Sequence, residues 1–208
     1  MSGSPGALLL VIAGYFIGAI PFGLLIGRVA GGVDLRDHGS GRTGATNALR
    51  TIGPAGAVLV FALDAAKGVV AVLLVCWLYG AGPAGSPPWV AAAAGFAAIA
   101  GHIRSVFIGF TGGRGVATFA GSMLAIAPWT LAMVVPVVAL VVWRTRYVSL
   151  GSLTGALLAP LAAVTLAAFG AASWAAVALA LGGAVLVTLA HGDNVARLRA
   201  GTERKIGQ

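Results

Sequence analysis

The sequence has few charged residues and a single cysteine. Charged side chains make up 9% of the 208 residues, and only five of them are acidic. Soluble globular proteins carry about 25%. So little charge could not cover a soluble protein in which hydrophobic residues reach 59%. The composition therefore excludes a soluble globular domain, a disordered chain and a coiled coil, and it indicates a polytopic membrane protein.

Cysteine and histidine are too scarce for several classes of site. Cys76 has no second cysteine with which to form an intrachain disulfide, and three histidines without a cysteine cluster give no zinc pattern. We therefore predict no metal and no cofactor. A net charge of +8 would suggest nucleic acid for a soluble protein. In a membrane protein basic residues first set orientation, so we expect no nucleic-acid partner.

Long apolar segments follow one another along the chain. They cover residues 7–27, 55–80, 88–103, 116–143, 147–170 and 173–191. As a helix the first would be about 31 Å long, which matches the hydrocarbon thickness of a bilayer. No basic stretch precedes it and no small-residue cleavage site follows, so we interpret it as a retained helix rather than a signal peptide.

The positions of the basic residues predict how often the chain crosses the membrane. They lie between or after the apolar segments, at Arg28, Arg36, Arg42, Arg50, Arg104, Arg114, Arg144, Arg146, Arg197, Arg199, Arg204 and Lys205. The junctions near 80–88, 127–129 and 170–173 carry no charge. All basic residues can share one side only if segment 116–143 crosses twice, with a break near Pro128.

We therefore predict an all-α membrane protein, a compact bundle of about seven transmembrane helices that forms one domain over residues 1–208. The N-terminus lies outside and the C-terminus is cytoplasmic. Residues 116–127 are short for a full span. This helix either begins earlier, within 112–115, or is re-entrant.

The first of three polar segments, residues 37–50, contains more donors than membrane orientation requires. Its candidate residues are Gly39, Ser40, Gly41, Arg42, Gly44, Thr46, Asn47 and Arg50. Glycine permits positive φ and exposes backbone N–H groups, and the arginine guanidinium matches a phosphate. The combination is typical of an anion cradle, although a flexible glycine–serine loop would have a similar composition.

The second polar segment stands directly before an apolar segment. It reads Gly101-His102 and then Thr111-Gly112-Gly113-Arg114-Gly115-Val116-Ala117-Thr118. A glycine-rich turn that enters a helix offers free N–H groups and the positive end of the helix dipole to an anion. The pattern is not a Walker A motif. A plain glycine loop and a packed His102 are the simpler interpretations.

The third polar segment, residues 191–205, begins where the last apolar segment ends. His191 and Asn194 are three residues apart and share a helical face. A basic tail on anionic lipid would explain Arg197 to Lys205, but not His191, Asn194 or Glu203. In the predicted topology all three polar segments lie on one side of the membrane, which favours a single anion-binding active site.

Asp64 and Lys67 lie inside an apolar segment, where charge is costly. At a spacing of three they can pair on one face of a helix. Either the pair is structural, or Lys67 adds positive charge to the anion site.

Together these motifs resemble those of the PlsY-type acyl-phosphate:glycerol-3-phosphate acyltransferases, in order and spacing over nearly the whole chain. The matching residues are Gly39-Ser40-Gly41-x-x-Gly44-Ala45-Thr46-Asn47-x-x-Arg50, Asp64-x-x-Lys67-Gly68, Gly101-His102, Gly112-Gly113-Arg114-Gly115-Val116-Ala117-Thr118 and His191-x-x-Asn194-Val195-x-Arg197-Leu198-x-x-Gly201-Thr202-Glu203. The resemblance implies a multi-pass enzyme of the bacterial inner membrane with a cytoplasmic active site. It would transfer a fatty acyl group from acyl phosphate to the 1-hydroxyl of glycerol 3-phosphate, giving lysophosphatidic acid and phosphate, the first step of phospholipid synthesis. We expect a monomer.

The resemblance also implies roles for individual residues. The expected catalytic residues are Ser40, Arg50, Arg114, His191 and Asn194. The expected substrate-binding residues are Gly41, Gly44, Thr46, Asn47, Lys67, His102, Gly112, Gly113, Thr118 and Glu203. Arg50 and Arg114 would bind phosphates and Glu203 would tether an arginine. His191 is the candidate base, although a substrate phosphate oxygen could take the proton instead.

The sequence departs from the family pattern in three places. Arg42-Thr43 replaces the usual Asn-Pro, Arg104-Ser105 replaces an aromatic residue and proline, and Thr111-Gly112-Gly113-Arg114 replaces Lys-Gly-Gly-Lys. Arg42 and Arg104 are candidates to restore the charge lost at 111.

Three alternative functions follow from the same residues. A divergent relative could act on another polyol phosphate. A small transporter of an anionic solute could use Asp64, Lys67 and His191 as a polar pathway. An intramembrane serine protease could use Ser40 and His191.

Overall fold

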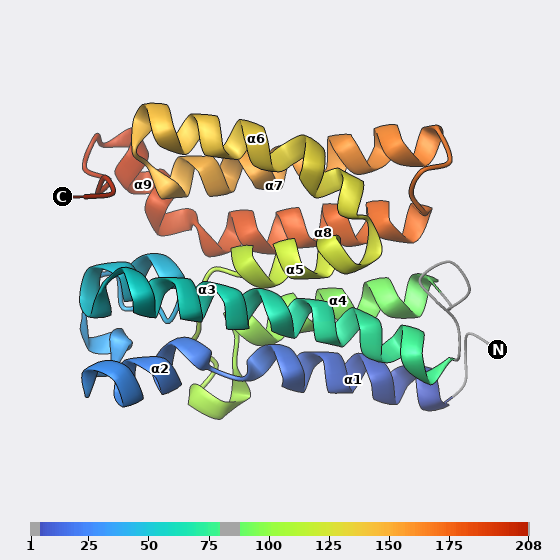
Figure 1. Ribbon diagram of the computed structural model, residues 1–208, viewed down its shortest axis with the longest axis horizontal. Helices are drawn as coiled ribbons and strands as arrows, with labels where there is room; N and C mark the ends of the chain where they lie inside the picture. Colours follow the sequence, from blue (N-terminus) through green and yellow to red (C-terminus); the bar gives the residue numbers. More distant parts are fainter. Residues whose placement is uncertain (1–4, 80–87, 208) are drawn as a thin grey trace.

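The computed structural model describes residues 5–79 and 88–207, and apart from one isolated bridge between Ser105 and Thr111 its regular structure is helical (Figure 1). In chain order the helices are α1 (Pro5–Ala19), α2 (Phe22–Gly31), the 3₁₀ turn η1 (Leu35–Asp37), α3 (Ala45–Leu78), α4 (Pro88–Ile103), the 3₁₀ turn η2 (Val106–Ile108), α5 (Val116–Ile126), α6 (Pro128–Thr145), α7 (Val148–Ala168), α8 (Trp174–Ala190) and α9 (Gly192–Arg199). The predicted all-α bundle is confirmed. The predicted outside loop near 80–88 falls almost wholly outside the described residues.

The predicted break in apolar segment 116–143 lies at Ala127. This residue has φ −151° and ψ 70° between α5 and α6, and Pro128 occupies the first turn of α6, where a missing N–H leaves no helical bond unmade. The expectation that α5 begins within 112–115 is wrong, because Gly115 caps it with a φ of 84°. A helix of 11 residues is about 16 Å long, roughly half the hydrocarbon thickness.

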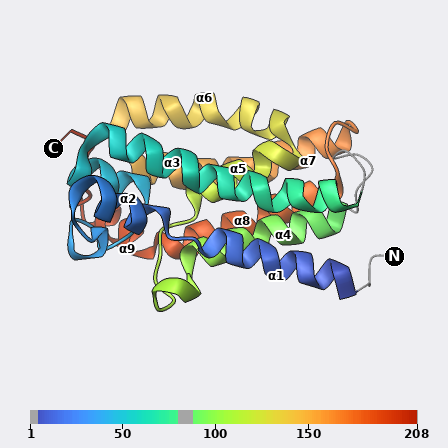
Figure 2. The ribbon, with the colours of Figure 1, turned by 60° about the horizontal axis from the view of Figure 1, so that its bottom comes forward.

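Four helical segments are long and apolar enough to cross a membrane. They are Pro5–Gly31, Ala45–Leu78, Pro128–Thr145 and Val148–Ala168, and a fifth results if α8 and α9, bent by 60°, count as one. Helices α4 and α5 are shorter, and both pack among other helices (Figures 1 and 2). With α1 and α2 taken together, α1 to α8 form seven helical segments, of which four or five are long enough to cross a membrane, so the seven crossings stay a prediction.

Glycine makes the closest helix contacts possible. A Cβ on Gly18 of α1 would overlap the backbone of Ala98 on α4, and a Cβ on Gly121 of α5 would overlap the backbone of Ala65 on α3. In lipid, helices associate largely through such close packing. Part of the high glycine content, 32 residues, thus serves the bundle rather than the loops.

Helix α3 consists of two pieces. Gly53 has a φ of 81° and a ψ of −176°, which are not helical, and Pro54 follows. The positive φ favours glycine, and proline supplies no N–H to the helix. The first piece, residues 45–52, carries polar side chains, and the second coincides with the predicted apolar segment 55–80.

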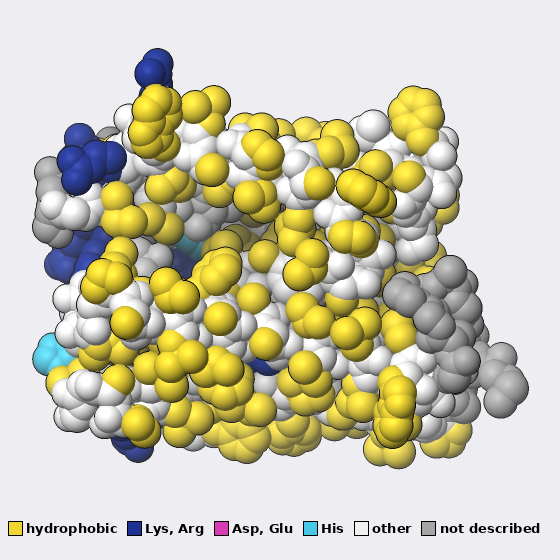
Figure 3. All heavy atoms as spheres, viewed as in Figure 1, with side chains coloured by type: hydrophobic (Ala, Val, Ile, Leu, Met, Phe, Trp, Pro, Cys, Tyr) yellow, Lys and Arg dark blue, Asp and Glu magenta, His cyan; other side chains and the backbone are white. Residues whose placement is uncertain are grey.

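Most basic side chains in view gather at one end of the molecule, and hydrophobic side chains are spread over the rest of the described surface in view (Figure 3). The basic end holds the start of α3, the turn between α6 and α7, and α9, and α1 begins at the opposite end (Figure 1). This is the one-sided distribution that the positive-inside rule describes. Which end faces the cytoplasm stays a prediction.

Candidate active site

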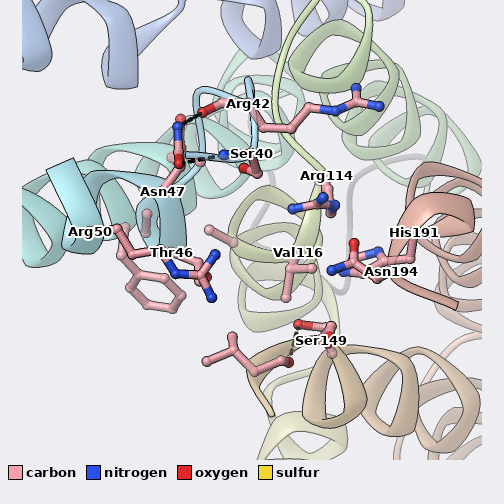
Figure 4. A pocket seen from close by; sticks show the side chains of 18 of the residues that line it. Ser40, Arg42, Thr46, Asn47, Arg50, Arg114, Val116, Ser149, His191 and Asn194 are labelled. Carbon is pink, nitrogen blue, oxygen red and sulfur yellow. Dashed lines mark hydrogen bonds between the residues drawn. The ribbon is translucent and has the colours of Figure 1, made fainter. Parts of the chain in front are cut away.

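Residues from all three polar segments meet in one cavity of about 150 Å³ at the basic end (Figure 4). All five expected catalytic residues line it: Ser40, Arg50, Arg114, His191 and Asn194. Five expected substrate-binding residues also line it: Gly44, Thr46, Asn47, His102 and Glu203. Five others are not among its lining residues: Gly41, Lys67, Gly112, Gly113 and Thr118.

Two helices begin at this cavity. Gly44, Ala45 and Thr46 line it at the start of α3, and Gly115, Val116 and Ala117 line it at the start of α5. Neither helix has a side-chain hydrogen bond at its N-cap. The first N–H groups of a helix have no partner within it, and they carry the positive end of the dipole. Both helices therefore present donors to an anion in the cavity, as was predicted for α5.

Asn47 shapes the loop before α3. Its Nδ2 donates to the backbone oxygens of Leu35 (2.7 Å), His38 (3.0 Å) and Arg42 (2.8 Å), and its Oδ1 accepts from the Ser40 N–H (3.0 Å). The amide has two N–H groups and meets three acceptors, so no donor is left for a substrate. The expected role of Asn47 as a substrate donor is therefore replaced by a role in holding Ser40 and Arg42 at the cavity.

The glycines of this loop differ from one another. Gly39 and Gly41 have φ values of 59° and 67°, as expected. A Cβ on Gly39 would also overlap the Asn47 amide. Gly44 instead has an extended backbone with φ −78°, as the N-cap of α3.

Asp64, Lys67 and His102 form a buried polar cluster that borders the cavity, since Asp64 and His102 are among its lining residues. Lys67 Nζ lies 2.8 Å from Asp64 Oδ1, and both side chains are 3% exposed. His102 Nδ1 lies 3.5 Å from the same oxygen. Lys67 Nζ also donates to the Ile20 carbonyl (3.1 Å), at the break between α1 and α2. The predicted pairing is confirmed, and Lys67 serves the helix break and Asp64 rather than the lining of the cavity.

Three other expected binding residues pack against this cluster. Thr118 donates its hydroxyl to the Asp64 backbone oxygen (2.8 Å). A Cβ on Gly112 would overlap the His102 backbone oxygen, and a Cβ on Gly113 would overlap the His102 ring. The two glycines therefore let the chain pass close to His102 on its way to Arg114.

Arg114 is held by a carboxylate that the sequence interpretation did not assign. Its Nη2 donates to Asp193 Oδ2 (2.7 Å), which also accepts from Arg197 Nη1 (3.1 Å). The Arg114 side chain is 15% exposed, and its Nε is buried without a hydrogen-bond partner in the described part of the chain. Asp193 thus fixes one edge of the guanidinium and leaves another donor free.

Glu203 joins α7 and α9 at the rim of the cavity. It accepts from Ser149 Oγ (2.8 Å) on α7, and from Asn194 Nδ2 (2.7 Å) and Arg197 Nε (2.7 Å) on α9. Burial raises the pKa of this carboxyl, but the three hydrogen bonds outweigh burial, so the pKa lies below its ordinary value. The prediction that Glu203 tethers an arginine is confirmed.

Ser149 and Ser152 line the cavity and were missed. They lie in the apolar segment 147–170 and were overlooked for that reason. Their spacing of three, directly after the basic pair Arg144 and Arg146, is a signal that could have found them.

His191 and Asn194 each keep one polar atom available (Figure 4). His191 Nδ1 lies 2.7 Å from the Val187 carbonyl, which fixes the proton of a neutral ring on Nδ1 and leaves Nε2 as an acceptor. Asn194 Oδ1 is buried without a hydrogen-bond partner among the described residues. Both atoms can accept a hydrogen bond from a hydroxyl group.

Of the two arginines expected to restore charge, only Arg42 lines the cavity. Arg50 lines it as well, and its Nη2 donates to the Arg204 backbone oxygen (3.4 Å). Arg104 is exposed and donates to the Phe110 carbonyl (3.5 Å) outside the cavity. The expectation for Arg104 is therefore wrong.

Comparisons with known proteins agree with one another. A profile of the family described as glycerol-3-phosphate acyltransferase matches residues 8–201. The glycerol-3-phosphate acyltransferase of Synechococcus sp. (strain JA-3-3Ab) is 46% identical, over 97% of this chain and 94% of that protein. Glycerol-3-phosphate acyltransferase 3 of Dehalococcoides mccartyi (strain ATCC BAA-2266 / KCTC 15142 / 195) is 42% identical, over 97% and 96%.

Solved structures match the whole fold. The crystal structure of PlsY (YgiH), an integral membrane glycerol 3-phosphate acyltransferase, in its glycerol 3-phosphate form is 37% identical with a TM-score of 0.85, and the match covers 97% of this chain and 96% of that one. The structure of the lysophosphatidic acid form is 36% identical with a TM-score of 0.84, and the match covers the same shares of the two chains.

Proposed function

The chain belongs to the glycerol-3-phosphate acyltransferase family, and from this premise we propose that it transfers a fatty acyl group from acyl phosphate to the 1-hydroxyl of glycerol 3-phosphate. The observation that carries the proposal is the cavity itself. Four arginines line it, Arg42, Arg50, Arg114 and Arg197, together with two uncapped helix N-termini, at the end of an apolar bundle. Such a site suits two phosphorylated substrates, one of which carries a lipid tail.

The reaction needs no acyl-enzyme, because acyl phosphate is already an activated mixed anhydride. The 1-hydroxyl oxygen attacks the acyl carbon, a new ester C–O bond forms, and the C–O bond to phosphate breaks. The hydroxyl proton is removed, and inorganic phosphate leaves. The protein must hold two anions close together, align the hydroxyl and stabilise the oxyanion.

The side chains divide these tasks. Arg50 and Arg114 bind the phosphates together with the N–H groups at the starts of α3 and α5. His191 Nε2 accepts the hydrogen bond of the attacking hydroxyl and takes its proton. Asn194 Oδ1 accepts a hydrogen bond from a hydroxyl group of the glycerol, since the Asn194 amide nitrogen already donates to Glu203. The Ser40 hydroxyl and Thr46 supply neutral donors.

An apolar groove adjoins the cavity and suits the acyl chain. Its volume is about 330 Å³, and it shares Ala45, Thr46, Phe61 and Val148 with the cavity. The rest of its lining comes from residues 49–58 of α3 and from Ile206. The reactive carbonyl would lie among the arginines, with the chain directed along α3 toward the bilayer.

We also propose that the cavity faces the cytoplasm in a bacterial inner membrane and that the chain acts as a monomer. In this proposal Arg42, Gly112 and Arg197 face the cytoplasm. Because a Cβ on Gly112 would overlap the His102 backbone oxygen, the exposed neighbour Thr111 takes the reporter cysteine in its place. Cysteines at positions 42, 111 and 197 in a Cys76→Ser background should resist an impermeant reagent applied to intact cells, and position 85 should react. Labelling of position 111 from outside would reverse the topology.

Purified protein with palmitoyl phosphate, with and without glycerol 3-phosphate, tests the reaction. We expect phosphate and lysophosphatidic acid to form together, only with both substrates present. Palmitoyl-CoA in place of palmitoyl phosphate should give little product, and equal turnover would refute the acyl-phosphate donor. Product from a different polyol phosphate alone would point to a divergent relative.

The same preparation tests for a transporter and for a protease. Flux of an anionic solute into liposomes without chemical conversion would identify a transporter. Labelling of Ser40 by a mechanism-based serine probe would identify a protease, but no hydrogen bond links Ser40 to His191 among residues 5–79 and 88–207.

A further inference from the structure

A second apolar groove lies on the face formed by α1, α4 and α8, which Figure 2 shows side by side. It has a volume of about 540 Å³ and shares no lining residue with the active-site cavity or with the acyl groove beside it. Small residues of α4 and α8 form its floor, among them Ala93, Ala97 and Gly182. Tyr15 of α1 and Phe96 of α4 line it as well.

Arg104 stands at one end of this groove. On α4 the lining residues Trp89, Ala93, Ala97 and Ala100 repeat at intervals of three or four, and Arg104 follows Ala100 by four residues. Helical spacing therefore puts Arg104 in line with the groove, and its N–H continues the helical pattern by donating to the Ala100 carbonyl (2.8 Å). Tyr15, which lines the groove, donates its hydroxyl to the Arg104 carbonyl (2.7 Å).

The charge of Arg104 is not balanced by an acid. The five carboxylates of the chain belong to Asp34, Asp37, Asp64, Asp193 and Glu203. Within residues 5–79 and 88–207 none of them forms an ion pair with Arg104, whose guanidinium makes one long hydrogen bond to Phe110. An exposed, unpaired guanidinium at the end of an apolar groove matches an anionic group attached to a hydrocarbon chain.

The loop beyond Arg104 also fits a membrane surface. Phe107 and Phe110 are 56% and 57% exposed. The Phe107 ring lies 6.1 Å from that of Phe16 on α1, so the aromatic cluster sits beside the end of the groove. Exposed aromatic rings next to a basic residue are typical of the boundary between hydrocarbon and headgroups.

We propose that this groove binds one anionic phospholipid of the surrounding leaflet, with an acyl chain between α1, α4 and α8 and the headgroup phosphate at Arg104. From Trp89 to Arg104 the helix rises about 22 Å, more than the roughly 15 Å of one leaflet, so the groove accommodates a full chain. The lipid is distinct from substrate and product, because the groove does not meet the active-site cavity.

Native mass spectrometry of the purified protein in a delipidating detergent tests the proposal by titration with phosphatidylglycerol and with phosphatidylcholine of the same chains. Arg104→Gln removes the charge, and Ala97→Leu fills the middle of the groove. Arg144→Gln removes another exposed arginine, at the end of α6, and is the matched control. Thermal stability of each variant verifies folding.

We expect the wild-type protein to bind phosphatidylglycerol about fivefold more tightly than phosphatidylcholine, the preference that one arginine gives at an anionic surface. Arg104→Gln should abolish this preference, Ala97→Leu should weaken both lipids, and Arg144→Gln should change neither. Equal losses from Arg104→Gln and Arg144→Gln would overturn the proposal. So would phosphatidylglycerol binding that persists undiminished in Ala97→Leu, or a dimer that dissociates in Ala97→Leu, since a second copy would then occupy the groove.

Discussion

Two clusters of charged residues lie within this membrane protein, and they differ in how completely they are neutralised. In the buried polar cluster, Asp64 meets Lys67 and His102, and Lys67 satisfies the carbonyl of Ile20. In the cavity, Arg114 keeps Nε and Asn194 keeps Oδ1 without partners, and Arg42 and Arg50 have no carboxylate partner among the described residues. The first cluster pairs its charges internally, with Asp64 and His102 bordering the cavity, whereas the second has donors and acceptors left over. The comparison teaches that surplus polar atoms, rather than charge alone, distinguish a site for anions from a structural ion pair.

Breaking the internally paired cluster should have the largest effect, and on stability. Lys67→Met leaves Asp64 buried without its partner, which typically costs about 3–5 kcal/mol. The molecules that still fold should turn over substrate at a rate within a few-fold of wild type, because Lys67 does not line the cavity. Thermal unfolding and the rate per folded molecule check both statements. A stable Lys67→Met protein with no activity would place Lys67 among the phosphate ligands, as the sequence pattern allowed.

Removing a surplus donor should instead affect catalysis. Arg114→Ala removes a charge-assisted contact worth about 2–4 kcal/mol in the transition state, or about 30- to 1,000-fold in rate. Arg114→Lys should retain part of the activity, because a point charge still attracts phosphate. Initial rates against glycerol 3-phosphate measure both variants, with thermal stability in parallel. A stable Arg114→Ala protein with a near-normal rate would remove Arg114 from the site.

Asp193 orients Arg114 but does not itself line the cavity. A variant of Asp193 therefore tests how far the alignment of Arg114 matters for catalysis. Asp193→Asn keeps an acceptor oxygen but loses the charge, so we expect a loss of about 1 kcal/mol, or roughly fivefold in kcat/KM. The loss should largely disappear in the Arg114→Lys background, where there is no guanidinium to align. Equal losses in both backgrounds would show that Asp193 acts independently of residue 114.

The smallest effect is confined to acidic pH and concerns Glu203. Its folded-state pKa is lowered because hydrogen bonds from Ser149, Arg197 and Asn194 outweigh burial. The stabilisation it provides is fully present above its unfolded pKa of about 4.3 and is lost as the pH falls through the folded value. The melting temperature of wild type should therefore fall more steeply below pH 4 than that of Glu203→Gln. Parallel curves for the two proteins would contradict this role.

Much of the fold follows from the sequence, because apolar length and arginine position are local signals. The apolar segment 88–103 coincides with α4, and Pro128 marks the break that was predicted. The start of α3 at Ala45 was not predicted, since its first piece is polar and the Gly53-Pro54 pair is typical of a helix end. Tertiary contacts of Asn47 hold the loop that leads into this piece.

The location of the cavity was predicted from the sequence, but several hydrogen bonds that hold its residues in place were not. The three polar segments could be placed on one side of the membrane, so their convergence was foreseeable. The bonds of Asn47 to three backbone carbonyls, and of Asp193 to Arg114, depend on distances between residues far apart in the chain. No spacing in the sequence reports such distances. Arg42 and Arg104 illustrate this limit of sequence-based prediction. Both were candidates to restore the charge lost at position 111, and only Arg42 lines the cavity.

The non-helical backbone at Gly53 gives α3 two independent tilts. The piece from Ala55 to Leu78 rises about 36 Å, longer than the roughly 30 Å of a typical hydrocarbon core, so it must lean or thicken the bilayer around it. Because Arg50 and Thr46 lie on the other side of Gly53, that lean need not turn them away from the substrates. A bilayer of different thickness can therefore change the tilt of residues 55–78 without a matching rotation of the helix N-terminus that lines the cavity.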